Sequence, residues 1–244
     1  MGFVQTIRTC YERRGLIWVL PLMCGGRIPS PVVAAVPPGP GARKNRAVQP
    51  EPVTLPGKLI QLVPLAERHI PDLARAGQDE TIWRYFNMPV GWTATEANMA
   101  HFVRELVDRQ ARGIELPFAV VLRETGRAVG MIRYADIDAR HRSLEVGGAW
   151  YGTPYQRTGV NTECRYLILG HAFEALGCLR VQFKADLRNE RPLRALERIG
   201  AVREGVLRQH MIMPDGHRRD SVIFSILDRE WPAVKALLER LMAR

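Results

Sequence analysis

YQRTGVNTE, residues 155–163, joins an apolar run typical of a strand to an amphipathic run typical of a helix. A strand, a tight loop with Gly159 and a helix that begins near Thr162 would leave unpaired backbone N–H groups at the positive end of a helix dipole. Such a place binds phosphates, and Arg157 adds positive charge. No acid occurs in this stretch before Glu163. The stretch therefore favours a site for a negatively charged group.

The same residues also fit an ordinary strand-to-helix turn. Asn161 or Thr162 would then cap the helix, and one glycine does not separate the two interpretations. The loop is not a Walker A motif, because Thr153 stands where that motif needs Lys, and no G-x-G-x-x-G fingerprint occurs in the chain. The nature of the ligand stays open at this point.

Strand-like and helix-like segments alternate on both sides of the loop. Apolar alternation predicts strands, and apolar residues at helical spacing predict helices. The expected strands are 58–65, 117–123, 128–135, 143–151, 180–185, 204–213 and 220–227, and the expected helices are 67–77, 95–113, 162–177, 189–200 and 229–243. This order predicts an α/β (α+β) domain with a mixed sheet flanked by helices.

Residues 1–57 are predicted to be a disordered, basic extension rich in Pro and Gly, and residues 58–244 to form the folded domain. The net charge is +10, and residues 1–58 supply +6 of it, from eight Lys/Arg and two Asp/Glu. The remaining 27 Lys/Arg and 23 Asp/Glu leave +4 for the rest. Binding of RNA or lipid headgroups by the extension is an alternative, but a plain extension is favoured, and we expect neither a membrane nor a nucleic-acid partner.

Cysteine and histidine usage limits the chemistry of the chain. Its four cysteines, at positions 10, 24, 164 and 178, form no C-x-x-C pair. Neither a disulfide framework nor a zinc site is therefore predicted, and a reducing, cytoplasmic location fits best. The six histidines show no H-E-x-x-H spacing, so no metal is expected. No apolar run reaches the roughly 18 residues of a membrane span.

From about Leu59 to the C-terminus, the order of elements and the loop residues resemble the GNAT superfamily of acyl-CoA-dependent N-acyltransferases, most closely its RimJ/RimL-like branch. The resemblance implies a mostly antiparallel sheet with a V-shaped splay between the fourth and fifth strands. It also implies a pyrophosphate loop of pattern Q/R-x-x-G-x-G/A for acetyl-CoA. The matching residues are Gln156, Arg157, Thr158, Gly159, Val160 and Asn161, followed by Thr162.

The resemblance also implies where the rest of the ligands would lie. Asn189, which opens NERPLRALERIGA, matches the asparagine that contacts the pantetheine arm in the family. Trp83, Tyr85 and Phe86 fall where the family forms one wall of its acceptor pocket, although plain core aromatics are about equally expected there.

The resemblance identifies a candidate for the catalytic base but none for the general acid. In the strand 143–151, Gly147 and Gly148 suit the bulge that the family carries, and Glu145 stands where many relatives have a carboxylate that deprotonates the acceptor amine. A polar residue on a half-exposed strand is the other interpretation of Glu145. No general acid can be assigned, since Leu196 and Pro192 replace the family's Tyr and Ser; Tyr151 and Tyr155 are the nearby candidates.

These inferences predict transfer of an acetyl group from acetyl-CoA, as cosubstrate, to a primary amine. The acceptor would be a protein N-terminal α-amine or a small-molecule amine. A noncatalytic module that binds acyl-CoA or nucleic acid is the alternative, supported by the altered loop and the missing acid. The acyl-chain preference and the oligomeric state, with a homodimer among the options, are left open.

Overall fold

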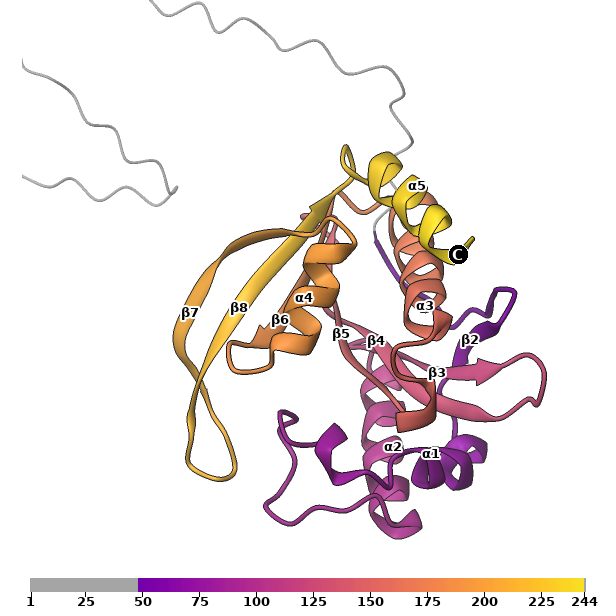
Figure 1. Ribbon diagram of the computed structural model, residues 1–244, viewed down its shortest axis with the longest axis vertical. Coiled ribbons are helices and arrows are strands. Elements are labelled where there is room, and N and C mark those ends of the chain that lie inside the picture. Colours follow the sequence, from indigo (N-terminus) through magenta and orange to yellow (C-terminus); the bar gives the residue numbers. More distant parts are fainter. Residues whose placement is uncertain (1–47, 244) are drawn as a thin grey trace, which may run out of the picture. The chain divides into compact units, whose positions relative to one another are not determined.

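One mixed sheet forms the centre of the computed structural model, which describes residues 48–243 (Figure 1). The strands of this range all belong to the sheet, in the order β1-β2-β3-β4-β5-β6-β8-β7. They are β1 (Leu55–Pro56), β2 (Ile60–Pro64), β3 (Leu116–Leu122), β4 (Ala128–Asp138), β5 (Ser143–Tyr151), β6 (Arg180–Asp186), β7 (Val202–Ile212) and β8 (Arg218–Leu227). All neighbours are antiparallel except β5 and β6. The predicted mixed, mostly antiparallel sheet is confirmed.

Helices cover both faces of the sheet. The α-helices are α1 (Ile70–Ala76), α2 (Glu96–Ala111), α3 (Gly159–Gly170), α4 (Glu190–Arg198) and α5 (Trp231–Met242). Short turns of 3-10 helix are η1 (Glu67–His69), η2 (Glu80–Ile82) and η3 (Thr153–Tyr155), and a π-helical turn, η4 (His171–Ala175), continues α3. Each predicted helix is present, and Thr95 caps α2 by accepting a hydrogen bond from the Asn98 amide.

Two apolar cores lie on opposite faces of the sheet. One contains Val160 of α3, Leu196 of α4 and Trp231 of α5 against alternate strand residues such as Ile132. The other contains residues of α1 and α2, including Leu73. The helices on the α3 face and those on the α2 face therefore form separate layers, with the sheet between them.

The structure corrects the start of α3. The helix begins at Gly159 rather than near Thr162, and its cap is Thr158 rather than Asn161 or Thr162. The Thr158 hydroxyl accepts a hydrogen bond from the Val160 amide at 3.3 Å and donates one to the Tyr155 carbonyl at 2.7 Å. The cap therefore comes one residue before the glycine, because Thr158 is the first side chain that can reach the free amides of the turn.

The predicted domain boundary lies between residues 57 and 58. Residues before this boundary, as well as those after it, contact the sheet. Val48 has no exposed surface and lies in the core on the α3 face. Leu55 and Pro56 pair with Leu62 and Gln61 of β2 as an edge strand. The predicted extension falls otherwise on residues 1–47, which lie outside the described residues.

Candidate active site

The site is built where the one parallel pair of strands separates. β5 and β6 pair only at Ser143, Leu144 and Glu145, which face residues 180–182. Beyond Glu145, β5 stays paired with β4, and β6 stays paired with β8. The two strands therefore diverge, which is the predicted splay between the fourth and fifth strands once the two-residue β1 is left out.

A bulge in β5 lies directly beyond the last parallel pair. The register with β4 shifts between Met131 and Arg133, where β5 has an extra residue. Gly148 takes a φ of 60°, which a residue with a side chain rarely adopts. A Cβ on Gly147 would approach Oε1 of Glu145 to 2.8 Å, so the glycine leaves room for the carboxylate. The predicted bulge is confirmed, and it brings Glu145 against the backbone at the vertex of the splay.

Glu145 belongs to a cluster of charges that joins three strands. The ammonium of Lys184 on β6 lies 2.8 Å from the Glu145 carboxylate and 2.5 Å from that of Asp136 on β4. Burial lowers the pKa of Lys184, but its hydrogen bonds to Asp136 and Glu145 outweigh burial and raise it above its ordinary value. The hydrogen bond from Lys184 in turn lowers the pKa of the Asp136 carboxyl. The vertex therefore holds one ammonium between two carboxylates.

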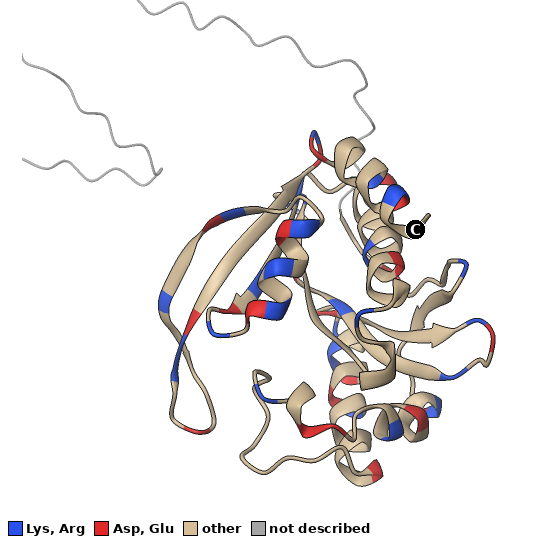
Figure 2. Cartoon of the chain, in the orientation of Figure 1, with Lys and Arg blue, Asp and Glu red and all other residues tan. Residues whose placement is uncertain are grey.

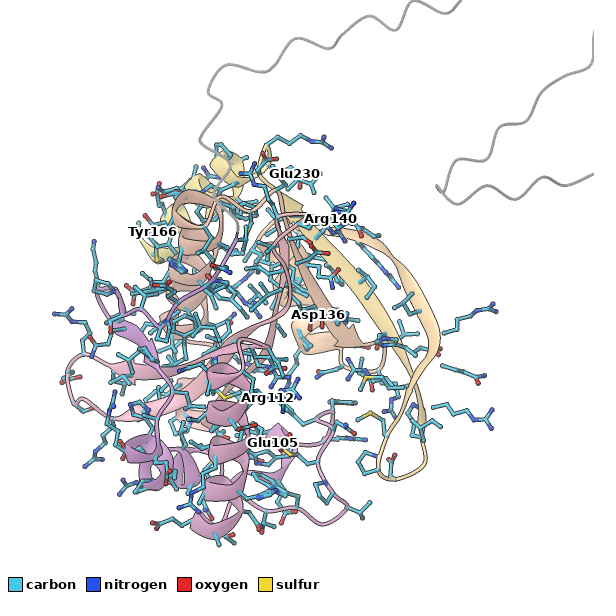
Figure 3. All side chains as sticks on the ribbon, turned by 180° about the vertical axis from the view of Figure 1, so that it is seen from behind. Glu105, Arg112, Asp136, Arg140, Tyr166 and Glu230 are labelled. Carbon is cyan, nitrogen blue, oxygen red and sulfur yellow. The ribbon has the colours of Figure 1, made fainter. Side chains whose placement is uncertain are left out.

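Asp136 has an unusual backbone. Its φ is 45°, in the left-handed region, at a second register shift between β4 and β5. Asp tolerates this region better than most residues, but the conformation still costs about 1 kcal/mol or more. Viewed from behind, Asp136 lies near the middle of the sheet (Figure 3). The backbone conformation and the contact with Lys184 together aim this carboxylate at the vertex.

The loop 156–158 leads from β5 into α3. Arg157, and not Gly159, takes the left-handed conformation, with φ of 60°. The Gln156 side chain donates to the Tyr151 carbonyl at 3.0 Å, which ties the loop to the end of β5. The first amides of α3 have no acceptor within the helix, so this turn presents N–H groups and a positive dipole end. It can hold an anion, as the sequence predicts.

Three residues of the first turn of α3 turn inward. Val160 and Thr162 are buried, so their side chains contribute to the core. The Asn161 side chain accepts a hydrogen bond from the Tyr151 hydroxyl at 3.1 Å. Asn161 therefore points toward β5. Its side chain is larger than the small residue of the family pattern, but it points away from the backbone amides of the loop and leaves them accessible.

Glu163, the acid that ends the quoted stretch, is turned away from the loop. Its carboxylate accepts hydrogen bonds from the amides of Lys58, Leu59 and Ile60, at 2.5, 2.8 and 3.0 Å. These amides lie at the start of β2 and in the two residues before it, and Glu163 is buried. Three backbone N–H groups thus stabilise the negative charge of Glu163, one helical turn after Gly159.

The remaining predicted ligand residues divide between the splay and the core. Asn189 stands just before α4, and its side chain makes no capping hydrogen bond to that helix. Tyr85 approaches the neighbouring Arg188, with its hydroxyl 3.4 Å from the Arg188 carbonyl and its ring 5.6 Å from the guanidinium. Trp83 and Phe86 instead pack in the core on the α2 face, and the Trp83 indole donates to the Gly77 carbonyl. Of the three aromatics, only Tyr85 lies beside the β6–α4 connection.

The two tyrosine candidates for the general acid are both at least partly buried. Burial raises the pKa of Tyr151 well above its ordinary value, and its hydroxyl is engaged by Asn161. Tyr155 is half-buried and packs against the core. Both sulfhydryls in the described region are buried, and burial raises the pKa of Cys164 to about 11 and that of Cys178 to about 12, so neither is a reactive thiolate.

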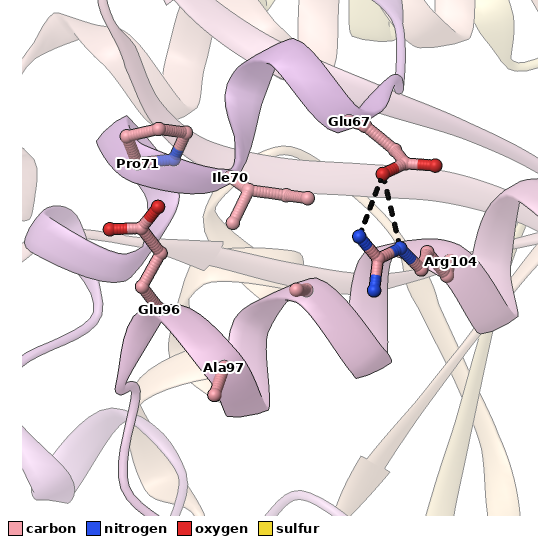
Figure 4. Close-up of a pocket in the computed structure, with 7 residues that line it drawn as sticks. Glu67, Ile70, Pro71, Glu96, Ala97 and Arg104 are labelled. Atoms are coloured by element: carbon pink, nitrogen blue, oxygen red, sulfur yellow. Dashed lines mark hydrogen bonds and ion pairs between the residues drawn. The ribbon is translucent and has the colours of Figure 1, made fainter.

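A further surface groove lies apart from the predicted site. An open groove of about 460 Å³ runs between α1 and α2 (Figure 4). An ion pair between Glu67 and Arg104, at 3.0 Å, closes one end of it. Within residues 48–243, no group of three or more His, Cys, Asp or Glu side chains is placed to hold a metal ion, and no helix is long and apolar enough to cross a bilayer.

A sheet that splays beside its one parallel pair, next to a loop of free amides, is the architecture that the resemblance to the GNAT superfamily implies. The acetyltransferase (GNAT) domain family matches residues 60–202, which is more than half of the chain. The chain belongs to the GNAT acetyltransferase family.

Individual relatives agree with this assignment. A candidate ribosomal N-acetyltransferase of Bacillus subtilis, YdaF, is 36% identical over a segment that covers 45% of this chain and 59% of YdaF, so the match spans less than two thirds of that relative. A GCN5-related N-acetyltransferase from Brucella melitensis is 29% identical, with TM-score 0.72, over 80% of this chain and 87% of that one. An acetyltransferase candidate from T. thermophilus is 37% identical, with TM-score 0.71, over 79% and 98%. The resemblance to the RimJ/RimL-like branch is confirmed.

Sequence reasoning missed the partners of the predicted residues. Lys184 and Asp136 meet Glu145 from neighbouring strands, and Arg191 and Arg198 of α4 reach the loop region. The alternation in RVQFKA places Lys184 on the polar face of its strand, which was a usable signal. Which strand lies beside it depends on the sheet order, and no local pattern carries that information.

Proposed function

We propose that this chain transfers the acetyl group of acetyl-CoA to a primary amine, with the α-amine of a protein N-terminus as the acceptor. Membership of the GNAT family supports acetyl transfer to an amine. The observation that carries the assignment of residues is the position of Glu145 at the last backbone pair before β5 and β6 diverge. A pantetheine arm lying in this splay would bring its thioester close to the carboxylate.

In this proposal the phosphates of the coenzyme bind at the first turn of α3, on the amides that follow Thr158 and beside Arg157. The pantetheine arm then runs into the splay, past the bulge formed by Gly147 and Gly148. Asn189, on the other side of the splay, has a side chain that does not cap its helix and can contact the arm.

The reaction requires one proton acceptor and one leaving group. Glu145 takes one proton from the acceptor ammonium, and the free amine attacks the thioester carbonyl. The C–S bond then breaks, the coenzyme leaves as a thiolate, and the second proton of the amine nitrogen passes to that thiolate or to water. An ordinary thiol has a pKa of about 8.5, so departure near neutral pH does not need a strong general acid. This fits a site in which the Tyr151 hydroxyl is buried and bonded to Asn161.

The cluster at the vertex supports a cationic acceptor. Glu145 and Asp136 already hold the ammonium of Lys184, so the same two carboxylates can receive the ammonium of an entering amine. An α-amine is favoured over a lysine side chain, because its pKa is roughly 2.5 units lower and it is thus easier to deprotonate by about 3 kcal/mol. The description of YdaF as a candidate ribosomal N-acetyltransferase also supports a protein acceptor. A small-molecule amine is the second choice.

The test is Glu145→Gln, with thiol release measured on a panel of N-terminal peptides and small amines. We expect kcat to fall by about 10² to 10⁴-fold at neutral pH, with unchanged affinity for acetyl-CoA in calorimetry. The deficit should shrink as pH rises, since an amine that is already neutral needs no base. Glu105→Gln, an exposed carboxylate on α2, is the matched control.

Normal turnover by Glu145→Gln with the wild-type pH profile would show that the carboxylate is structural. Binding of acetyl-CoA without thiol release for any amine would instead indicate a noncatalytic module. Equal loss of affinity and rate would mean that the substitution damaged the splay, so both are measured on one preparation.

A further inference from the structure

The arginines of α4 differ in their partners. Arg194 forms an ordinary pair along the helix with Glu190, at 2.6 Å. Arg191 and Arg198 are exposed, and among residues 48–243 neither has a carboxylate oxygen within 4.0 Å. Basic positions recur along α4 (Figure 2). Two of its charges are therefore left without an acidic partner in this part of the chain.

Both of these arginines reach toward the loop and the start of α3. Nη1 of Arg191 lies 3.5 Å from Oε1 of Gln156, and Nη2 of Arg198 lies 3.5 Å from Oγ1 of Thr162. Seven residues separate them, which places them on one side of the helix, two turns apart. A separation of 3.5 Å from a neutral oxygen is at the outer limit of a hydrogen bond. The two guanidinium groups thus contact one residue before and one residue after the first amides of α3, and both contacts are weak.

The region between them is positive. Arg157 adds a third guanidinium from the loop, while the carboxylate of Glu163 is bound to the start of β2. The carboxylate of Asp79 accepts hydrogen bonds from Thr153 and Thr81, and these bonds are the main causes that lower its pKa. The charge of Arg191 is a smaller cause. A region with three cations and a helix N-terminus favours a ligand that carries more than one phosphate.

Coenzyme A carries two separate anionic groups, the diphosphate and the phosphate monoester on the 3′ position of its ribose. The guanidinium group matches phosphate oxygens with two parallel hydrogen bonds. Arg191 stands two residues after Asn189, at the end of α4 nearer to the splay. Arg198 is the last residue of the helix. A ligand that leaves the splay and crosses the loop would meet Arg191 first and Arg198 last.

We propose that Arg198 binds the 3′-phosphate of coenzyme A while Arg191 binds the diphosphate, an inference that rests on the proposed function. Arg198 is then the residue that distinguishes coenzyme A from its 3′-dephospho form. The loop amides bind coenzyme A and 3′-dephospho-coenzyme A equally well, because both molecules contain the diphosphate.

The experiment measures the Kd of the full chain for coenzyme A and for 3′-dephospho-coenzyme A by calorimetry. We expect wild type to prefer coenzyme A by roughly tenfold, and Arg198→Gln to lose this preference without weakening the dephospho form. Arg191→Gln should weaken both forms by a similar factor. Arg198→Lys should restore part of the preference as a point charge, and Arg194→Gln should match wild type.

Two results would overturn the inference while leaving the proposed function intact. The first is binding of coenzyme A by Arg198→Gln with the wild-type preference. The second is an equal loss for both forms in Arg198→Gln, which would place that arginine on the diphosphate. Failure of wild type to bind either form would instead refute the coenzyme site and the proposed function with it.

Discussion

Two glutamates near the splay have opposite surroundings. Glu163 is buried and accepts hydrogen bonds from three backbone amides at and just before the start of β2, whereas Glu145 shares an ammonium with Asp136 at the vertex. A carboxylate that accepts several backbone N–H bonds is fixed in place, and its charged form is stabilised. In the proposed reaction, the ion pair at Glu145 would exchange the ammonium of Lys184 for that of the acceptor. The different surroundings of the two glutamates therefore come from their positions in the fold and not from their residue type.

His69 predicts how stability responds to acid. It is 7% exposed, and its Nδ1 accepts a hydrogen bond from the Ala66 amide at 3.2 Å, which requires a neutral ring nitrogen there. Burial, followed by the charge of Arg68, lowers its pKa from 6.5 to about 4. The folded state therefore favours neutral His69, so this contribution is complete above pH 6.5 and is lost as pH falls toward 4. At pH 5 we expect a loss of about 2 kcal/mol in the free energy of unfolding.

The measurement is urea unfolding of wild type and His69→Asn at pH 7 and pH 5. Asn can accept the Ala66 hydrogen bond but does not titrate, so the variant should lose less stability on acidification. His101→Asn, an exposed position on α2, should behave as wild type. An identical acid response of wild type and His69→Asn would refute the role of this side chain.

At the scale of elements, we expect a substitution at the start of α3 to lower the affinity for coenzyme A with little effect on the free energy of unfolding. A Cβ on Gly159 would meet Cδ1 of Leu59 at 2.9 Å, the movable end of a side chain, and its φ lies outside the left-handed region. Gly159→Asp should therefore change the free energy of unfolding by no more than about 1 kcal/mol. It places a carboxylate where phosphate would bind, so affinity for coenzyme A should fall by roughly tenfold or more.

Gly205→Asp is the control for that variant, because it adds the same charge on β7, where a Cβ has nothing within 4 Å. Calorimetry with coenzyme A should give wild-type affinity for this control. Unchanged affinity in Gly159→Asp would refute the assignment of the phosphate loop, whatever its stability.

Helices and strands were predictable because their signals are local. Apolar periodicity, the Thr95 cap and the turn before Arg218 each depend on a few neighbouring residues. The start of α3 was misjudged because Thr158, Asn161 and Thr162 can all cap, and only the path of the chain from η3 decides among them. The π-helical turn after Gly170 has no comparable signal, since its causes lie in packing.

The candidate site was predictable only in part. Glu145 and the loop follow from short motifs, and the structure places them at the splay. Lys184 lies beside Glu145 only because β6 returns parallel to β5 after a helix, and Trp83 joins the core only because Trp150 and Phe102 lie around it. Such contacts join residues far apart in the chain, so they depend on the complete topology.

For the whole molecule, the N-terminal boundary predicts the result of truncation. Val48 is fully buried, and β1 pairs with β2. Deletion of residues 1–56 should lower the free energy of unfolding by roughly 2–4 kcal/mol, through lost burial of Val48 and lost edge pairing. Deletion of residues 1–42, which leaves Val48 and β1 in place, should leave stability and coenzyme affinity unchanged. Urea unfolding checks both, and equal stability of the two variants would contradict the role of the segment 48–56.

The strand order also bears on how the protein is synthesised. From β1 to β6 the strands lie in the sheet in the order in which the ribosome makes them, so each can add beside its predecessor as the nascent chain emerges. The order breaks at the end, where β8 inserts between β6 and β7. Only three residues of β6 pair with β5, whereas the whole of β6 pairs with β8. The pairing that holds β6, one wall of the splay, is thus complete only after residue 227 has been translated.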